Sequence, residues 1–333
     1  MNKPVLEIEN LKTCFDTRDG MVTAVDGVSL KVNQGECLGI VGESGSGKSV
    51  TFASVMGLVK KPGFIAEGEI RFEGRNLVGL DANEYRNLRG KEIAMTMQDA
   101  LTALNPAYTV SDQIIEALLE HDETLTGSKR QKFRQARDKA VEMMDLVGIP
   151  AAKSRLDDYP HQFSGGMRQR IMIAIALACR PTLLIADEPT TALDVTIQAQ
   201  VLELIADIQD KLGMSVVLIT HDLGVVAEFC DRVIVMYAGQ VVESGPTREV
   251  IDNPQHPYTQ GLLNSIPRLS DLKHRIEPIM GTVPDLIQLS PQCRFLGRCT
   301  QSTEACSSSV DMREIGEGRG VRCTLVSPAG EAE

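Results

Sequence analysis

The stretch that decides the fold is Gly42-Glu43-Ser44-Gly45-Ser46-Gly47-Lys48-Ser49, which matches the phosphate-binding pattern G-x-x-x-x-G-K-[ST]. It follows the apolar run 37–41 and precedes a segment with helical patterning that begins at Val50. In a strand, glycine-rich loop and helix of this order, backbone N–H groups surround a phosphate and the helix dipole adds positive charge. The sequence therefore predicts an α/β fold of the P-loop NTPase class.

The residue types in this loop suit a nucleotide with its magnesium ion. Lys48 would add a full positive charge at the phosphates, and the Ser49 hydroxyl would bind Mg²⁺. The glycines allow the backbone to approach the phosphate closely. The predicted nucleotide contacts in the loop are Gly42, Ser44, Gly45, Ser46, Gly47, Lys48 and Ser49.

Two adjacent carboxylates follow the buried-strand pattern 183–186, namely Asp187 and Glu188. Core packing requires no acids at this point, whereas a Mg²⁺–nucleotide site needs one acid for the metal and one to activate water. Asp187 is assigned the first role and Glu188 the second. The strand 216–220 ends at His221, which we expect at the same sheet edge as a γ-phosphate contact.

The predicted secondary structure changes along the chain. Residues 1–100 show short strand patterns, including 22–25 and 29–32, and 110–158 show helical periodicity. From 164 to 245 helical and strand patterns alternate, which indicates a parallel sheet. Prolines interrupt the pattern after about residue 250. We expect a first domain over 1–265 with a helical subdomain at about 100–160, a Cys-rich extension over 266–326 and a loose tail at 327–333.

The segment Phe163-Ser164-Gly165-Gly166-Met167 opens an apolar helical pattern. Serine at a helix start is an ordinary N-cap. The same arrangement also offers bare N–H groups and a helix dipole to an anion.

Taken together, the phosphate loop, FSGGM, LLIADEP, Thr191-Ala-Leu-Asp194 and His221 resemble the nucleotide-binding subunits of ABC transporters over about residues 5–245. The resemblance implies an antiparallel β subdomain, and two such domains that enclose two ATP molecules between them. It implies that Ser164, Gly165 and Gly166 complete the partner's ATP site. The usual pattern is LSGGQ, and Met167 replaces the glutamine, so we expect one polar contact to be lost without loss of function.

The resemblance assigns three further residues. Gln98 matches the Q-loop, which contacts Mg²⁺ and the attacking water, and Asp194 matches the D-loop. Phe15 matches the aromatic residue that stacks on adenine, although a core role at a strand end suits it equally well.

Residues 253–263 and the segment 101–106 resemble the peptide and nickel importer branch of this family. The last four cysteines have the spacing C-x5-C-x6-C-x16-C, wider than that of zinc-ribbon pairs. By the same resemblance, Cys293, Cys299, Cys306 and Cys323 are expected to bind a [4Fe–4S] cluster. Structural Zn²⁺ and free buried thiols remain alternatives.

Composition restricts the partners. With 45 acidic and 34 basic residues among 333, the net charge is −11, which disfavours nucleic acid and anionic lipid as binding surfaces. The longest apolar run, 171–179, is too short to span a bilayer, and the N-terminal residues do not resemble an export signal. We therefore expect a peripheral protein on the cytoplasmic face of a bacterial inner membrane.

The resemblance implies specific partners. These are a second ABC ATPase, usually a paralogue that forms a heterodimer, two transmembrane permease subunits and, indirectly, an extracytoplasmic peptide-binding protein. The expected activity is ATP hydrolysis coupled to import of dipeptides or oligopeptides. The alternatives are an importer ATPase for haem, nickel or a modified peptide, and a soluble ABC ATPase acting on DNA or ribosomes. The soluble class carries a heptad-repeat insertion or two cassettes, and neither is evident here.

Overall fold

The computed structural model describes residues 3–98, 100–191, 193–265, 278–287 and 289–327. Contacts divide the chain into two compact units. The first unit comprises Met1–Val5, Asn33–Glu36 and Gly79–Val217. The second comprises Leu6–Val32, Cys37–Val78 and Leu218–Glu333.

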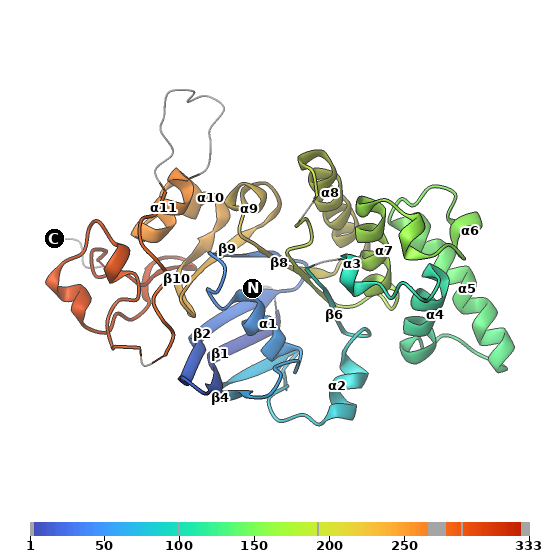
Figure 1. Ribbon diagram of the computed structural model, residues 1–333, viewed down its shortest axis with the longest axis horizontal. Coiled ribbons are helices and arrows are strands. Elements are labelled where there is room, and N and C mark those ends of the chain that lie inside the picture. The colour runs from blue at the N-terminus through green and yellow to red at the C-terminus, as the bar shows by residue number, and fades with distance from the viewer. Residues whose placement is uncertain (1–2, 99, 192, 266–277, 288, 328–333) are drawn as a thin grey trace. The chain divides into compact units, whose positions relative to one another are not determined.

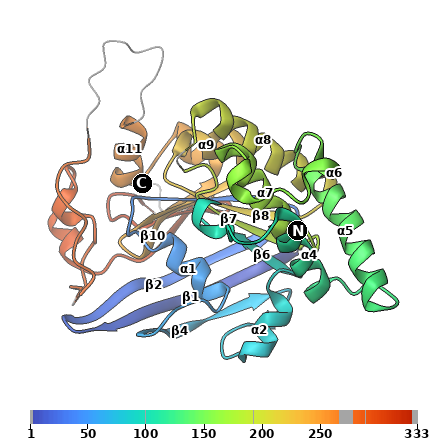
Figure 2. The ribbon, with the colours of Figure 1, turned by 45° about the vertical axis from the view of Figure 1, so that its right-hand side comes forward.

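A four-stranded sheet in the second unit contains β1 (Pro4–Thr17), β2 (Gly20–Asn33), β4 (Gly63–Phe72) and β5 (Arg75–Asn76), in the order β2–β1–β4–β5. β1 pairs antiparallel with β4, and the long strands run side by side in both Figure 1 and Figure 2. The prediction of two short strands at 22–25 and 29–32 is wrong, because β2 is continuous. Gly27 adopts φ 65° within it, so the glycine accommodates an irregularity without ending the strand.

The second sheet of this unit supports the phosphate loop. It is part of an eight-stranded sheet, and the strands of that sheet that lie wholly in this unit have the order β11 (Arg313–Gly316), β12 (Arg319–Val321), β10 (Gln240–Pro246), β9 (Arg232–Tyr237), β3 (Cys37–Val41). β3 and β9 are parallel, whereas β9, β10, β12 and β11 pair antiparallel. The helices of this unit are α1 (Lys48–Val55), α9 (Leu223–Phe229), α10 (Thr247–Asp252) and α11 (Pro257–Asn264).

The cysteine-rich segment shares a core with these strands. Short 3-10 turns form at Leu296–Arg298 and Glu304–Ser307. Phe295 packs edge-on against Tyr237 and Tyr258, with ring centroids 5.2 and 5.4 Å away. Further along, β12 pairs with β10. The segment is therefore packed against the strands next to the phosphate loop.

Pro257 does not prevent a helix. It is the first residue of α11, where its missing N–H has no helical partner to lose. The expected boundary at 265/266 adjoins residues 266–277, and the expected tail at 327–333 includes residues 328–333. Both 266–277 and 328–333 lie outside the described residues.

The first unit contains the parallel pair β6 (Ile93–Thr96) and β7 (Leu183–Asp187). β8 (Ser215–Thr220) begins in this unit and ends in the other. The helices of the first unit are α2 (Ala82–Leu88), α3 (Ala100–Ala103), α4 (Val110–His121), α5 (Lys129–Leu146), α6 (Ala152–Arg155), α7 (Gly165–Leu177) and α8 (Val195–Leu212). A 3-10 turn forms at Pro160–Gln162. α4, α5 and α7 pack on one another (Figure 1), so the helical pattern over 110–158 is confirmed.

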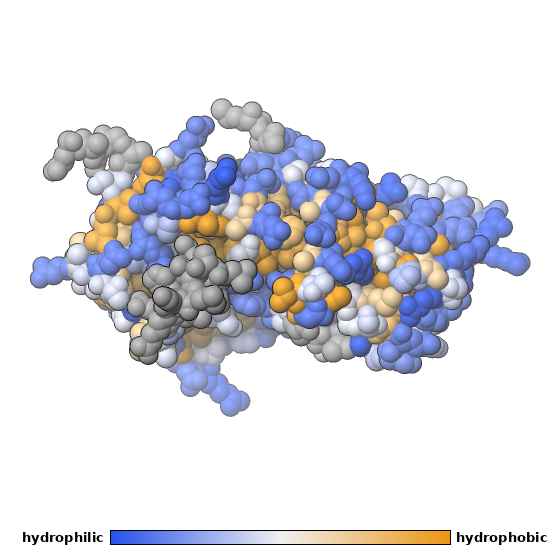
Figure 3. Space-filling view, turned by 90° about the horizontal axis from the view of Figure 1, so that it is seen from above, coloured by the Kyte–Doolittle hydropathy of each residue, from blue (hydrophilic) through white to orange (hydrophobic). Residues whose placement is uncertain are grey.

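The surface combines hydrophilic and hydrophobic areas on the face seen in Figure 3. Exposed large apolar side chains include Met97, Tyr108, Tyr159 and Val195. Across the described ranges, every helix is too short or too polar to cross a bilayer.

Candidate nucleotide-binding site

The phosphate loop lies in the second unit, between β3 and α1. All five residues of β3 are buried, which fixes where the loop begins. Two of its glycines are required by the backbone. At Gly42 (φ 156°) a Cβ would lie 2.1 Å from the Met236 carbonyl oxygen, and at Gly47 (φ 98°) it would lie 2.6 Å from that of Ala24. The loop therefore fits closely under the neighbouring strands.

Lys48 points into this loop. Its side chain is buried, and its Nζ donates to the carbonyl oxygens of Gly42 (2.6 Å) and Glu43 (3.0 Å) and to Ser46 Oγ (3.4 Å). These acceptors hold the ammonium group inside the loop. A phosphate oxygen is a stronger acceptor for this cation than a neutral carbonyl.

Gln98 and Glu188 lie at the ends of neighbouring strands in the first unit. β6 and β7 are parallel, with Thr96 opposite Ala186, so the residues that follow them emerge at the same edge. Gln98 Nε2 donates to Glu188 Oε2 at 2.9 Å. Thr191 Oγ1 donates to the same oxygen at 2.8 Å. The structure thus brings Gln98 and Glu188 together and adds Thr191, which had no role in the sequence-based prediction.

The backbone at Glu188 is unusual. Glu188 adopts φ 45°, which is uncommon for a residue with a side chain. Such conformations cost on the order of 1–3 kcal/mol and gather at functional sites. The preceding Asp187 is the last residue of β7 and is buried. The two acids therefore occupy different environments, one inside the strand end and one at its edge.

The segment Ser164–Met167 forms the start of α7. Ser164 is its N-cap and accepts a hydrogen bond from the Met167 N–H at 3.4 Å. A Cβ at Gly166 would lie 2.6 Å from Ile197 Cγ2, so Gly166 is needed for close packing on α8. Met167 Sδ lies 3.6 Å from Arg155 Nη1. Ser164 and Gly165 are exposed, which leaves them accessible to a partner.

The remaining predicted residues belong partly to the first unit and partly to the second. Asp194 caps α8 in the first unit, accepting from the Ile197 N–H at 3.0 Å. In the second unit His221 is exposed after β8. Phe15 is half-buried in β1 opposite Gly63, where a Cβ would lie 2.5 Å from the Phe15 ring. Ser49 is the second residue of α1, directly after Lys48.

The four C-terminal cysteines lie in one part of the second unit, and the Cys293 N–H donates to the Cys306 carbonyl at 3.0 Å. Burial raises the pKa of Cys293, Cys299 and Cys323. At Cys306, burial also acts to raise the pKa, but hydrogen bonds from Thr303 and Thr324 bring it below its usual value. Among the described residues, no three His, Cys, Asp or Glu side chains are grouped so that they could hold a metal ion. The expected cluster is therefore not supported by this arrangement.

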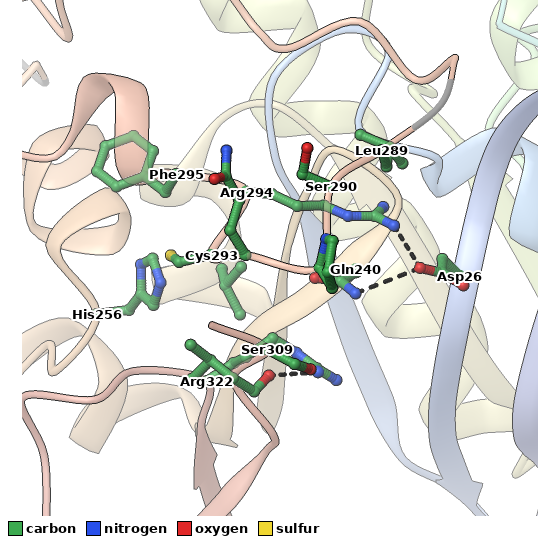
Figure 4. A pocket seen from close by; sticks show the side chains of 14 residues that line it. Asp26, Gln240, His256, Leu289, Ser290, Cys293, Arg294, Phe295, Ser309 and Arg322 are labelled. Carbon is green, nitrogen blue, oxygen red and sulfur yellow. Dashed lines mark hydrogen bonds and ion pairs between the residues drawn. The ribbon is translucent and has the colours of Figure 1, made fainter. Parts of the chain in front are cut away.

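A separate cavity of about 270 Å³ lies in the second unit (Figure 4). Arg294 forms an ion pair with Asp26 at one side of it. Arg322 donates to the Val241 and Val310 carbonyl oxygens, each at 2.9 Å. The only predicted site residue in its lining is Cys293. This cavity is thus distinct from the phosphate loop.

Comparison with known proteins agrees with the geometry. Residues 25–191 match the family model described as "ABC transporter". Residues 242–306 match "Oligopeptide/dipeptide transporter, C-terminal region". The chain belongs to the ABC transporter family. Since the ATP-binding proteins of this family are ATPases, it is an ATPase.

Relatives of this ABC protein match it over nearly its whole length. The dipeptide transport ATP-binding protein DppD of Bacillus subtilis is 52% identical over 329 residues, covering 98% of this chain and 96% of the relative. The oligopeptide transport ATP-binding protein AppD of the same organism is 48% identical, covering 98% of each chain. DppD of Haemophilus influenzae is 48% identical, covering 96% of this chain and 94% of the relative.

A solved structure gives the same fold for this ABC protein. The ATP-binding cassette MJ0796, in a dimeric post-hydrolysis state bound to ADP and Pi, matches with a TM-score of 0.64 and 27% identity, covering 73% of this chain and 99% of the other. The predicted P-loop α/β class is therefore correct at the level of the ABC cassette. The cysteine-rich metal-binding extension is not confirmed.

Proposed function

We propose that this ABC ATPase binds and hydrolyses ATP to power the import of dipeptides or oligopeptides through a membrane transporter. The observation that carries the proposal is the peptide-transporter C-terminal region at 242–306, joined to an ABC cassette in a chain about half identical to dipeptide and oligopeptide transport ATP-binding proteins. Another importer solute, such as haem, nickel or a modified peptide, would be an alternative outcome of the test below.

Each residue predicted from the sequence is given a role in the proposed ATP chemistry. Lys48 and the amides of Gly42, Gly45 and Gly47, with Ser44 and Ser46, hold the phosphates, and Phe15 stacks on adenine. Ser49, Gln98 and Asp187 hold Mg²⁺, the ion that neutralises charge on the phosphates. Glu188 is the general base, and its hydrogen bond to Gln98 supports a shared role in orienting water.

His221 is proposed to position the γ-phosphate. Ser164, Gly165, Gly166 and Asp194 would act on the ATP of a second cassette. The exposure of Ser164 and Gly165 at the start of α7 supports this assignment, because the helix N-terminus is open to an anion.

The proposed partners are a second ABC ATPase, preferentially a paralogue, and two transmembrane permease subunits, with a peptide-binding protein acting outside the cytoplasm. The chain would therefore work at the cytoplasmic face of the membrane. Met97 and Tyr108 flank the 101–106 segment and are more than half exposed, which supports a protein contact there. The acidic balance gives no support for a DNA or ribosome partner.

We also propose the domain division at 265/266, and a [4Fe–4S] cluster at Cys293, Cys299, Cys306 and Cys323, with Zn²⁺ as the alternative. The proposal is supported by the donor chemistry alone, since four thiols suit an iron–sulfur cluster or Zn²⁺. A metal would have to draw the four side chains together. Visible absorbance and iron and zinc analysis of anaerobically purified protein test this directly, and a colourless, metal-free protein would contradict it.

The function itself is tested by purification of the chain from its native membrane. We expect Mg²⁺-dependent ATP hydrolysis and co-purification of hydrophobic permease subunits. Co-purification of DNA or ribosomes in their place would contradict the importer assignment.

A further inference from the structure

We propose that Arg298, in the cysteine-rich segment, is a positioning residue for the phosphate loop, so that nucleotide affinity depends on the C-terminal segment. The inference rests on the proposed ATP-binding function of that loop. All the residues concerned belong to the second unit.

Arg298 is hydrogen-bonded to the phosphate loop through the Glu43 side chain. Its Nη1 donates to Glu43 Oε2 at 2.8 Å and its Nη2 to Glu43 Oε1 at 3.1 Å. Paired bonds of this kind fix orientation as well as distance. Only 7% of the Arg298 side chain and 28% of the Glu43 side chain are exposed, so water screens this pair less than it screens a fully exposed one. The hydrogen bonds that Arg298 donates to Glu43 are the main reason that the pKa of Arg298 is raised further above its ordinary range.

The guanidinium is itself held in place. Nη1 also donates a hydrogen bond to Tyr237 Oη at 3.3 Å. Nη2 donates to the Ile279 carbonyl oxygen at 3.2 Å, and Nε donates to the Met280 carbonyl oxygen at 3.1 Å. Every nitrogen of the group therefore has an acceptor. Arg298 is hydrogen-bonded both to the end of strand β9 and to residues 279–280. It therefore holds the Glu43 side chain in a fixed place relative to these segments.

The loop backbone has two further supports. The Glu43 N–H donates to Tyr258 Oη at 2.9 Å, and the Gly239 N–H donates to the Ser46 carbonyl at 2.9 Å. Arg294 in turn donates to the carbonyl of Ala238, next to Gly239, and pairs with Asp26, as Figure 4 shows for the latter. Two arginines of the C-terminal segment thus support the loop, one through a side chain and one through the β9–β10 turn.

Loss of the bonds between Arg298 and Glu43 would affect the orientation of Lys48. Lys48 donates to the carbonyl of Glu43 itself, so displacement of Glu43 would move an acceptor that now orients the ammonium group. The loop contacts phosphate before and during hydrolysis, and loss of such uniform binding raises KM with little change in kcat. We therefore expect Arg298 to affect ATP affinity much more than turnover.

The test compares Mg²⁺–ATP affinity, KM and kcat of the full chain with those of variants. Arg298→Ala should weaken ATP binding about tenfold, with kcat within about twofold. Arg298→Lys, which keeps the charge but cannot form the paired bonds, should be intermediate. The matched control is Arg313→Ala, since Arg313 donates to the Val326 carbonyl in the same segment and should leave affinity unchanged.

A double variant separates positioning from general damage. If Arg298 acts through Glu43, Glu43→Ala combined with Arg298→Ala should weaken ATP binding no more than the stronger single variant. Fully additive losses, or a folded Arg298→Ala that binds ATP as the control does, would overturn the proposal. If Arg298→Ala does not fold, Glu43→Gln removes the same ion pair with little change in shape and should weaken binding several-fold, and unchanged affinity would overturn the proposal. Failure of the wild-type chain to bind ATP would instead reject the proposed function.

Discussion

Glu188 shows how much of the proposed chemistry is set by single residues. Its backbone is held in the left-handed region directly after a buried strand, and its carboxylate accepts from both Gln98 and Thr191. A carboxylate that is already oriented by two donors can position a water molecule without further reorganisation. The residue-level geometry therefore favours Glu188 over Asp187 as the general base.

Replacement of this base should separate binding from chemistry. We predict that Glu188→Gln lowers the ATPase kcat by at least 100-fold, the smaller end of what general base catalysis contributes, because the amide cannot accept the proton. The variant should bind ATP within about twofold of wild type, as measured by nucleotide titration. Near-normal turnover in Glu188→Gln would refute the assigned role.

At the scale of elements, capping residues serve both folding and the proposed site. Asp194 begins α8 and accepts from the Ile197 N–H at 3.0 Å, and the resemblance also gives it a role at the partner's ATP. The two roles respond differently to substitution, since asparagine caps a helix about as well as aspartate.

We predict that Asp194→Ala lowers the free energy of unfolding by about 1 kcal/mol, whereas Asp194→Asn changes it by no more than a few tenths. Urea denaturation followed by circular dichroism measures both. An equal loss in the two variants would show that the carboxylate charge, and not the cap, supports α8.

The start of α11 carries a pH-sensitive cap. His256 is 2% exposed, and its Nδ1 accepts from the Tyr258 N–H at 3.0 Å. Burial lowers the pKa of His256 to about 4, because it disfavours the charged ring. In the unfolded chain the pKa is about 6.5. The folded state thus binds the proton less tightly than the unfolded state does.

His256 should therefore stabilise the folded state less as the pH falls. The contribution of His256 to stability is complete above pH 6.5 and is lost as the pH falls from about 6.5 to about 4, for a total of roughly 3 kcal/mol. His256→Asn keeps a capping side chain and should reduce the slope of unfolding free energy over this window. His161→Asn, at an exposed histidine, is the control and should keep the slope. A wild-type slope in His256→Asn would contradict the assignment.

Local sequence signals predicted the elements that contain the site. The apolar runs of β3, β7 and β9 and the cap at Ser164 could be identified because each depends on neighbours along the chain. The interruption between the predicted strands 22–25 and 29–32 was misleading, since a local break in the strand pattern does not reveal that the strand continues through it. The hydrogen bonds that Glu43 accepts from Arg298 and donates to Tyr258 could not be predicted, because they join residues more than 200 positions apart.

At the scale of the molecule, the sequence identifies the family more firmly than it places the C-terminal segment. Pairing of β12 with β10 and packing of Phe295 on Tyr237 arise from long-range contacts. The cysteine spacing suggested a metal-bound module, but the segment shares an apolar core with the strands, so it does not depend on a metal alone for its fold. What distinguishes this chain from a bare cassette is thus a segment that contacts the phosphate loop.

ATP hydrolysis by this chain is proposed to drive peptide import. The most direct measurement is uptake of a radiolabelled dipeptide and a labelled tetrapeptide by cells that lack this chain but keep the other transporter subunits. We predict that the wild-type chain restores uptake of at least one peptide and that Glu188→Gln, expressed to the same level, does not. Uptake that is unchanged by loss of the chain, or restored equally by Glu188→Gln, would contradict the account.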